Sequence, residues 1–163
     1  MDTEEKQKKD FLDILNFYAN LNYNAVIVQL RAAGDAFYKS EFSPWSRFLT
    51  GEEGKPSAWE EDNLDWMINE AHKRGMEFHA WLNPYRATFD MNTDILSNTH
   101  DYCTNPDWMV QYGKKYYYNP GLPEVRKRFS NVIEEIVVGY DIDAIHFDDY
   151  FYPYKIQDEL LKD

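Results

Sequence analysis

Hydrophobic residues form two kinds of pattern along this chain. In three segments they recur every three to four positions, which is typical of a helix with one buried face, and three shorter apolar runs have the character of buried strands. Helices are expected over residues 4–20, 61–74 and 123–139, and strands over residues 24–30, 76–82 and 144–148. Helices and strands that alternate in this way predict an α/β fold with parallel strands.

Local signals support the helix boundaries. Pro123 stands at a first-turn position and Gly75 stands where a helix commonly ends in a left-handed residue. The expected buried faces consist of Phe11, Leu15 and Tyr18 in the first helix, Leu64, Met67, Ile68 and Ala71 in the second, and Val125, Phe129, Val132, Ile133, Ile136 and Val137 in the third.

The connections are unequal in length. Long irregular segments, residues 41–60 and 87–121, follow the first and second strands, with a small hairpin expected near 109–118. Long ordered loops in compact domains are usually functional, and α/β barrels and doubly wound sheets carry their sites on the loops after the strands. Neither GxGxxG nor GxxxxGK[ST] occurs, which favours the barrel.

Three strands cannot close a (β/α)8 TIM barrel, which needs eight strands and about 250 residues. We therefore expect residues 1–163 to be one partial barrel domain that lacks the first strand and the C-terminal half, with a further helix beginning at 155–163.

Composition and charge exclude several classes of partner. The 17 basic and 29 acidic residues give a net charge of −12, which argues against nucleic acid and against an anionic membrane surface. Residues 1–10 lack the apolar region of a signal peptide, and no apolar run is long enough to span a bilayer. The aromatic content of 17% indicates either a large aromatic core or a cleft that stacks on planar ligands.

The stretch DAIHFDDYFYPY, residues 143–154, has the character of the mouth of a site. If it begins as a strand, Ile145 and Phe147 share one face, while His146 and Asp148 share the other. A strand that served only a core would not carry these polar groups, because an unpaired buried charge is costly. Asp148 is therefore expected to point inward, and Asp149 adjoins it.

The ends of all three strands are polar. The candidate set is Gln29, Arg31 and Asp35 after the first strand, His79, Trp81, Asn83 and Arg86 on and after the second, and His146, Asp148 and Asp149 on the third. Each residue also has a structural explanation: a strand histidine is often a hydrogen-bonded core residue, an aspartate can cap a turn, and the arginines can neutralise the acids. Polar residues at the same end of every strand favour a common site.

This set of residues limits the chemistry. No nucleophile elbow is present, and neither HxH nor HExxH occurs. Carboxylates among aromatic rings fit glycoside hydrolysis, with Asp148 as nucleophile or stabiliser and with no cofactor. Two alternatives remain open: a metal-dependent hydrolase or deacetylase with His79, His146 and Asp148 as ligands, and a non-catalytic glycan-binding barrel.

Five blocks of sequence resemble the glycosyl-hydrolase-like family 10 proteins. They are QLRAAGDAFYKS (29–40), PWSRFLTGEEG (44–54), EAHKRGMEFHAWLNPYR (70–86), NPGLPEVRKRF (119–129) and YDIDAIHFDDYFYPY (140–154). The resemblance implies a TIM-barrel glycosidase, with strands two to four of the barrel in this chain. It also implies a bacterial cell-wall or other polysaccharide as substrate and a location in the cell envelope or outside the cell.

On this interpretation the aspartates carry or flank the catalytic carboxylate and the other residues bind sugar. The expected catalytic residues are Asp148 and Asp149. His79, Asn83, Arg86 and His146 are expected to orient hydroxyl groups, Trp81, Tyr85 and Tyr150 to offer stacking faces, and Gln29, Arg31 and Asp35 to complete the polar rim.

Overall fold

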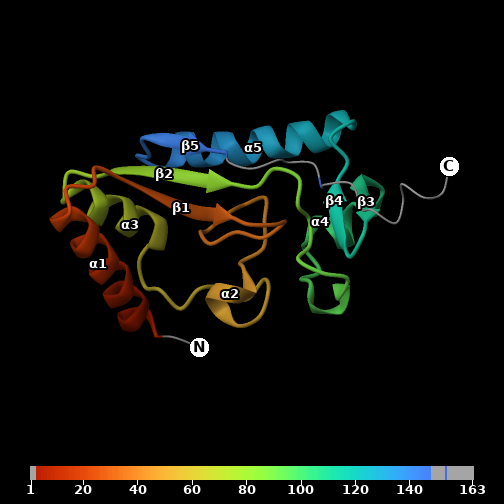
Figure 1. The fold of residues 1–163 in the computed structure, drawn as a ribbon. Helices are drawn as coiled ribbons and strands as arrows, with labels where there is room; N and C mark the ends of the chain where they lie inside the picture. The colour runs from red at the N-terminus through yellow and green to blue at the C-terminus, as the bar shows by residue number, and fades with distance from the viewer. Residues whose placement is uncertain (1–2, 148–152, 154–163) are drawn as a thin grey trace.

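The computed structural model describes residues 3–147 and 153, and its centre is a parallel sheet of three strands (Figure 1). The strands β1 (Ala25–Arg31), β2 (Glu77–Leu82) and β5 (Ala144–His146) lie in the order β1-β2-β5. Both neighbouring pairs are parallel, as the alternation of helices and strands predicted.

Three long helices accompany the sheet. They are α1 (Glu4–Asn20), α3 (Asn63–His72) and α5 (Pro123–Gly139). In Figure 1, α1 and α3 lie beside β1, and α5 runs along β2 and β5. All three contribute to one core, in which Leu15, Ile68 and Ile136 pack with Phe78 and Ala80 of β2 and are at most 1% exposed. No helix in the part of the chain that the structure describes is long and apolar enough to cross a membrane.

The predicted helix boundaries are largely confirmed. Pro123 is the first residue of α5, and Asp62 caps α3 by accepting from the amides of Leu64 and Asp65. Gly75 has a φ of +69°, the left-handed conformation expected of a glycine after a helix. Two predicted core positions are wrong. Tyr18 is 41% exposed and packs its ring on Tyr23 at the surface, and Val137 is 53% exposed because it follows the buried Ile136 by a rotation of about 100°.

The loops contain short elements. The expected hairpin is present as β3 (Met109–Tyr112) and β4 (Lys115–Tyr118). The structure adds α2 (Arg47–Thr50), η1 (Thr93–Ile95), α4 (Asp101–Thr104) and η2 (Pro106–Trp108). Elements of three or four residues are too short to show a hydrophobic period, so they could not be predicted from the sequence.

The second face of the sheet has no helix over it among residues 3–147. Ile27, in the middle of β1, is 51% exposed on this face, whereas its neighbours Val26 and Val28 pack into the core. In a closed barrel the face away from the helices lines the interior.

At the amino-terminal end of the strands, the carboxylate of Asp143 links β2 to α3. Asp143, just before β5, accepts hydrogen bonds through Oδ2 from the Phe78 amide at 2.7 Å and from His72 Nε2 at 2.8 Å. The Phe78 amide and then His72 lower the pKa of Asp143 from its usual 3.8. A carboxylate with a lowered folded-state pKa contributes stability that is complete above the unfolded pKa and is lost as the pH falls through the folded pKa.

We expect Asp143→Asn to reduce the free energy of unfolding by about 1 kcal/mol at pH 7, because the hydrogen bonds to a charged acceptor are lost. Urea unfolding followed from pH 7 to pH 2 should show the difference from the wild type shrinking at the acid end. Asp141→Asn is the control: it removes a charge from a side chain that is 94% exposed and lies 3.8 Å from His72 Nδ1, and it leaves the hydrogen bond from the Phe78 amide in place. A difference that stays constant down to pH 2 would contradict this role of Asp143.

Candidate active site

Three predicted site residues form a row across the strands. Gln29 of β1 is the register partner of Trp81 of β2, and Trp81 is the partner of His146 of β5. Side chains alternate along a strand, and the residues before these three, Val28, Ala80 and Ile145, all pack into the helix-covered core. Gln29, Trp81 and His146 therefore share the other face, close to the carboxyl ends of the strands.

His79 lies one layer below this row. Its partners are Ile27 and Ala144, and its Nε2 lies 3.0 Å from Glu77 Oε2. Two residues along a strand correspond to roughly 7 Å, so His79 is further from the strand ends than Trp81. Among the described residues, no three histidine, cysteine, aspartate or glutamate side chains gather in a way that could hold a metal ion.

Asn83 shapes the turn that follows β2. Its Oδ1 accepts from the amides of Tyr85 at 3.2 Å and Arg86 at 2.8 Å, and its own amide donates to Arg31 O. Tyr85 packs against the buried cluster of Ala87, Tyr118 and Val125. The observed contacts of Asn83 and Tyr85 thus hold the turn in place, and their contact with sugar stays a prediction.

Arg31 is 2% exposed and is held by protein groups. Its Nη1 donates to Asn83 O at 2.9 Å and its Nη2 donates to the Tyr118 hydroxyl at 3.3 Å, with the guanidinium 5.4 Å from the centre of the Tyr118 ring. These contacts support a positioning role, in which Arg31 joins the end of β1 to the loop after β2 and to the hairpin.

The network continues through residues that the sequence did not single out. The Tyr118 hydroxyl donates to Asp101 Oδ2 at 3.0 Å, and Arg128 Nη2 of α5 lies 3.1 Å from Asp101 Oδ1. Burial raises the pKa of Tyr118. Burial and the nearby Arg31 lower the pKa of His100 to about 4, so this 1% exposed imidazole is neutral at pH 7.

Three buried polar groups near the ends of β1 and β2 have no hydrogen-bond partner among the described residues. They are the carboxylate of Asp35, which is 1% exposed, and the Nε atoms of Arg31 and Arg86. Arg86 Nη1 donates to Ala32 O at 3.5 Å. Buried groups of this kind usually bind ordered water, so the region is suited to polar contacts. Asp148, Asp149 and Tyr150 lie outside the described residues.

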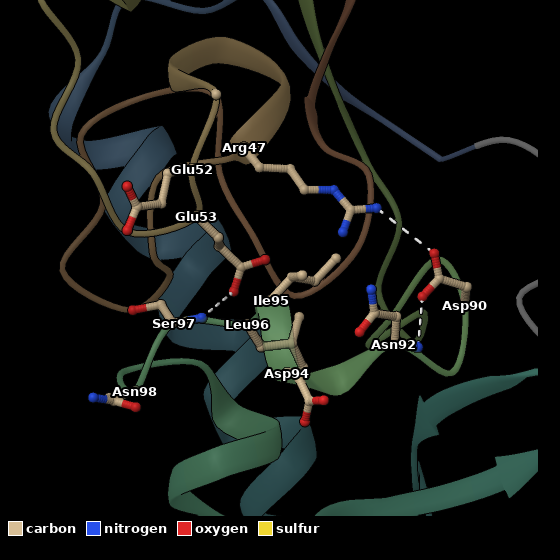
Figure 2. Close-up of a pocket in the computed structure, with 11 residues that line it drawn as sticks. Arg47, Glu52, Glu53, Asp90, Asn92, Asp94, Ile95, Leu96, Ser97 and Asn98 are labelled. Atoms are coloured by element: carbon tan, nitrogen blue, oxygen red, sulfur yellow. Dashed lines mark hydrogen bonds and ion pairs between the residues drawn. The ribbon is translucent and has the colours of Figure 1, made fainter.

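A separate hollow of about 770 Å³ lies between the loop after β1 and the loop after β2 (Figure 2). Segments 47–53 and 90–98 line it. Glu53 Oε1 accepts from the Ser97 amide at 2.9 Å, and Arg47 Nη2 lies 3.8 Å from Asp90 Oδ2. Burial raises the pKa of Glu53 to about 7; the charge of Asp35 acts in the same direction and the Ser97 amide opposes it.

The solved structures similar to this chain include sugar-processing enzymes. An α-galactosidase of the GH36 family, AgaA from Geobacillus stearothermophilus, matches 86% of this chain and 18% of its own with a TM-score of 0.56 and 16% identity. A hypothetical protein from Ruminiclostridium thermocellum matches 82% of this chain and 68% of its own with a TM-score of 0.55 and 17% identity. At such identities the likeness concerns the fold alone, and it supports an α/β fragment of a TIM-barrel domain.

Curated relatives are closer in sequence. Glycosyl hydrolase YngK of Bacillus subtilis (strain 168) is 48% identical over 161 residues, which are 98% of this chain and 31% of YngK. Glycosyl hydrolase DigH of Escherichia coli (strain K12) is 34% identical over 155 residues, which are 90% of this chain and 35% of DigH. The chain thus spans about a third of the length of these relatives. The family model Glycosyl hydrolase-like 10 matches residues 2–163, and the chain belongs to this family.

Proposed function

We propose that this chain is part of the catalytic barrel of a glycoside hydrolase that cleaves a bacterial cell-wall polysaccharide in the cell envelope. The observation that carries the proposal is the row of Gln29, Trp81 and His146 on the face away from the helices. One member of the row, His146, stands two positions before the aspartate pair in the sequence, and the residue types of the row are those that bind and orient a sugar.

Each member of the row has a chemical use. The indole of Trp81 offers a flat apolar face for the C–H groups of a pyranose ring, with a hydrogen-bond donor at its edge. Gln29 and His146 flank it with amide and imidazole groups that bind hydroxyls. Asp148 follows His146 by two positions in the sequence, and the expectation that the two share a face is part of this proposal.

Asp148 is proposed as the nucleophile or as the carboxylate that stabilises the positively charged transition state. Positioning matters as much as the identity of the carboxylate, because small displacements of a bound substrate are costly in rate. The Arg31 network serves this purpose by joining the end of β1 to Asn83 O and to the Tyr118 hydroxyl. His79, Asn83, Tyr85 and Arg86 remain proposed sugar-binding residues.

The relatives support a sugar as ligand. YngK and DigH are both described as glycosyl hydrolases. AgaA was crystallised in complex with raffinose, and TtGalA of Thermus thermophilus in complex with p-nitrophenyl α-D-galactopyranoside. The cell-wall substrate and the envelope location are our extension of the family resemblance.

The test is release of reducing ends from peptide-free cell-wall glycan strands by the full-length protein, with and without EDTA. We expect release that EDTA does not change. Saturable binding of the strands without new reducing ends over a long incubation would instead identify a glycan-binding barrel. Activity lost to EDTA and restored by a divalent metal would identify a metal-dependent hydrolase.

A further inference from the structure

The hollow between segments 47–53 and 90–98, shown in Figure 2, has none of the three residues of the row among those that line it. We propose that it is a second sugar-binding subsite, which takes an uncharged N-acetylated amino sugar of the glycan. The identity of the glycan rests on the function proposed above, whereas the subsite itself rests on the shape, rings and charges of these two loops.

The size and position of the hollow suit one or two sugar residues of a longer chain. Its volume of about 770 Å³ falls in the usual range of small-molecule pockets, which runs from about 300 to 1,000 Å³. The loops that line it follow β1 and β2, so they leave the sheet at the same end as the row. A glycan bound along the strand ends would extend over these loops.

The polar wall is held in place by the protein. Figure 2 shows the carboxylate of Glu53 beside Ser97, whose backbone amide donates a hydrogen bond to it at 2.9 Å, and the guanidinium of Arg47 directed toward Asp90. Asp90 Oδ1 in turn accepts from the Asn92 amide at 2.7 Å. Side chains fixed in this way present acceptors and donors to sugar hydroxyls without first having to be ordered, which favours binding.

An exposed aromatic ring adjoins this polar wall. Phe48 is 60% exposed, although Phe89 packs edge to face against it with ring centres 5.0 Å apart. The Arg47 guanidinium, part of the pocket lining, lies 5.1 Å from the Phe48 ring centre and 5.7 Å from that of Phe89. Ile95, 41% exposed, adds an apolar contact inside the pocket. A fixed and exposed phenyl ring is suited to stack on a pyranose.

The charge of the pocket selects among sugars. The lining residues include four acidic side chains, Glu52, Glu53, Asp90 and Asp94, and one guanidinium, that of Arg47. Glu53, whose pKa burial raises to about 7, carries only part of its charge at neutral pH, so the excess negative charge comes mainly from the other three. A uronic acid or another sugar with a carboxylate would be repelled there, because like charges brought together in a binding site cost several kcal/mol. Hydroxyl and N-acetyl groups carry no charge and can donate hydrogen bonds to the carboxylates.

The test compares two ring deletions in the full-length protein by calorimetric titration with chitohexaose, a neutral N-acetylglucosamine hexamer. We expect Phe48→Ala to weaken binding about tenfold through loss of the stacking face. Phe17→Ala is the matched control, since Phe17 is also 60% exposed and also packs edge to face, on Tyr18 of α1. The control should bind like the wild type, and hexagalacturonate should bind at least tenfold more weakly than chitohexaose.

The subsite is disproved if Phe48→Ala binds chitohexaose as the wild type does, if Phe17→Ala weakens binding equally, or if hexagalacturonate binds as tightly. These outcomes are separable from the catalytic proposal. Binding that depends on Phe48, without any release of reducing ends, supports the subsite and refutes the hydrolase. Release of reducing ends, together with unchanged binding by Phe48→Ala, supports the hydrolase and refutes the subsite.

Discussion

Replacing Asp148 with asparagine is expected to lower the rate of glycan cleavage by the full-length protein about a thousandfold. Asparagine keeps the size of the side chain but supplies neither a nucleophilic carboxylate nor a negative charge for an oxocarbenium-like transition state. Positioned acids and bases typically contribute 10²- to 10⁴-fold, which sets the scale of the expected loss. Initial rates of reducing-end release from peptide-free strands measure it.

Asp141→Asn is the matched control, because it makes the same change seven positions earlier in the sequence. The Asp141 side chain is 94% exposed and lies before β5, at the opposite end of the strand from the proposed site. Both variants should unfold at the wild-type temperature, and only Asp148→Asn should lose activity. Wild-type turnover by Asp148→Asn would remove this residue from the mechanism.

The row on the sheet was predictable because strand geometry is local. Once residues 24–30, 76–82 and 144–148 are taken as parallel strands, the period of two assigns each side chain to a face. The observed register then places Gln29, Trp81 and His146 side by side. Parallel strands also share one direction, so the polar residues at their ends meet at one edge of the sheet.

The environment of Arg31 and Asp35 was not predictable in the same way. The sequence placed both on a polar rim, whereas the structure buries them to 2% and 1% exposure. The residues that cover and contact this region, His100, Asp101 and Tyr118, come from the long insertion after β2. Contacts between irregular segments so far apart along the chain leave no periodic trace in the sequence.

The pocket of Glu53 was missed for the same reason. Its two walls lie more than thirty residues apart, and each consists of loop residues whose polarity alone predicts only exposure to solvent. The block PWSRFLTGEEG was recognisable as a family feature, yet nothing in the sequence indicated that it faces segment 90–98. Only the fold brings Arg47 near Asp90 and Glu53 near Ser97.

Gly34 shows how closely these loops pack, and its replacement by alanine is expected to be strongly destabilising. A Cβ atom at Gly34 would lie 2.3 Å from His100 Nε2 and 2.9 Å from the Tyr118 hydroxyl. The imidazole cannot move away freely, because it is 1% exposed and its Nδ1 accepts from the Tyr102 amide at 2.9 Å. Overpacking of a buried site costs about 1–3 kcal/mol, and we expect a value near the upper end.

Urea unfolding of the full-length protein measures this cost, and Gly139→Ala provides the comparison. A Cβ atom at Gly139, the last residue of α5, would meet nothing within 4 Å, and alanine favours a helix, so stability should stay unchanged or rise slightly. If the imidazole is the obstacle, Gly34→Ala should cost less than about 1 kcal/mol in a His100→Ala background, since contacting residues are not additive. An equal cost with and without His100 would mean that the glycine is needed for another reason.

The close packing of Gly34 against His100 also bears on activity. Displacing Gly34 would move Arg31 and Asp35, which lie on either side of it in the sequence. Gly34→Ala should therefore slow glycan cleavage as well as lower stability.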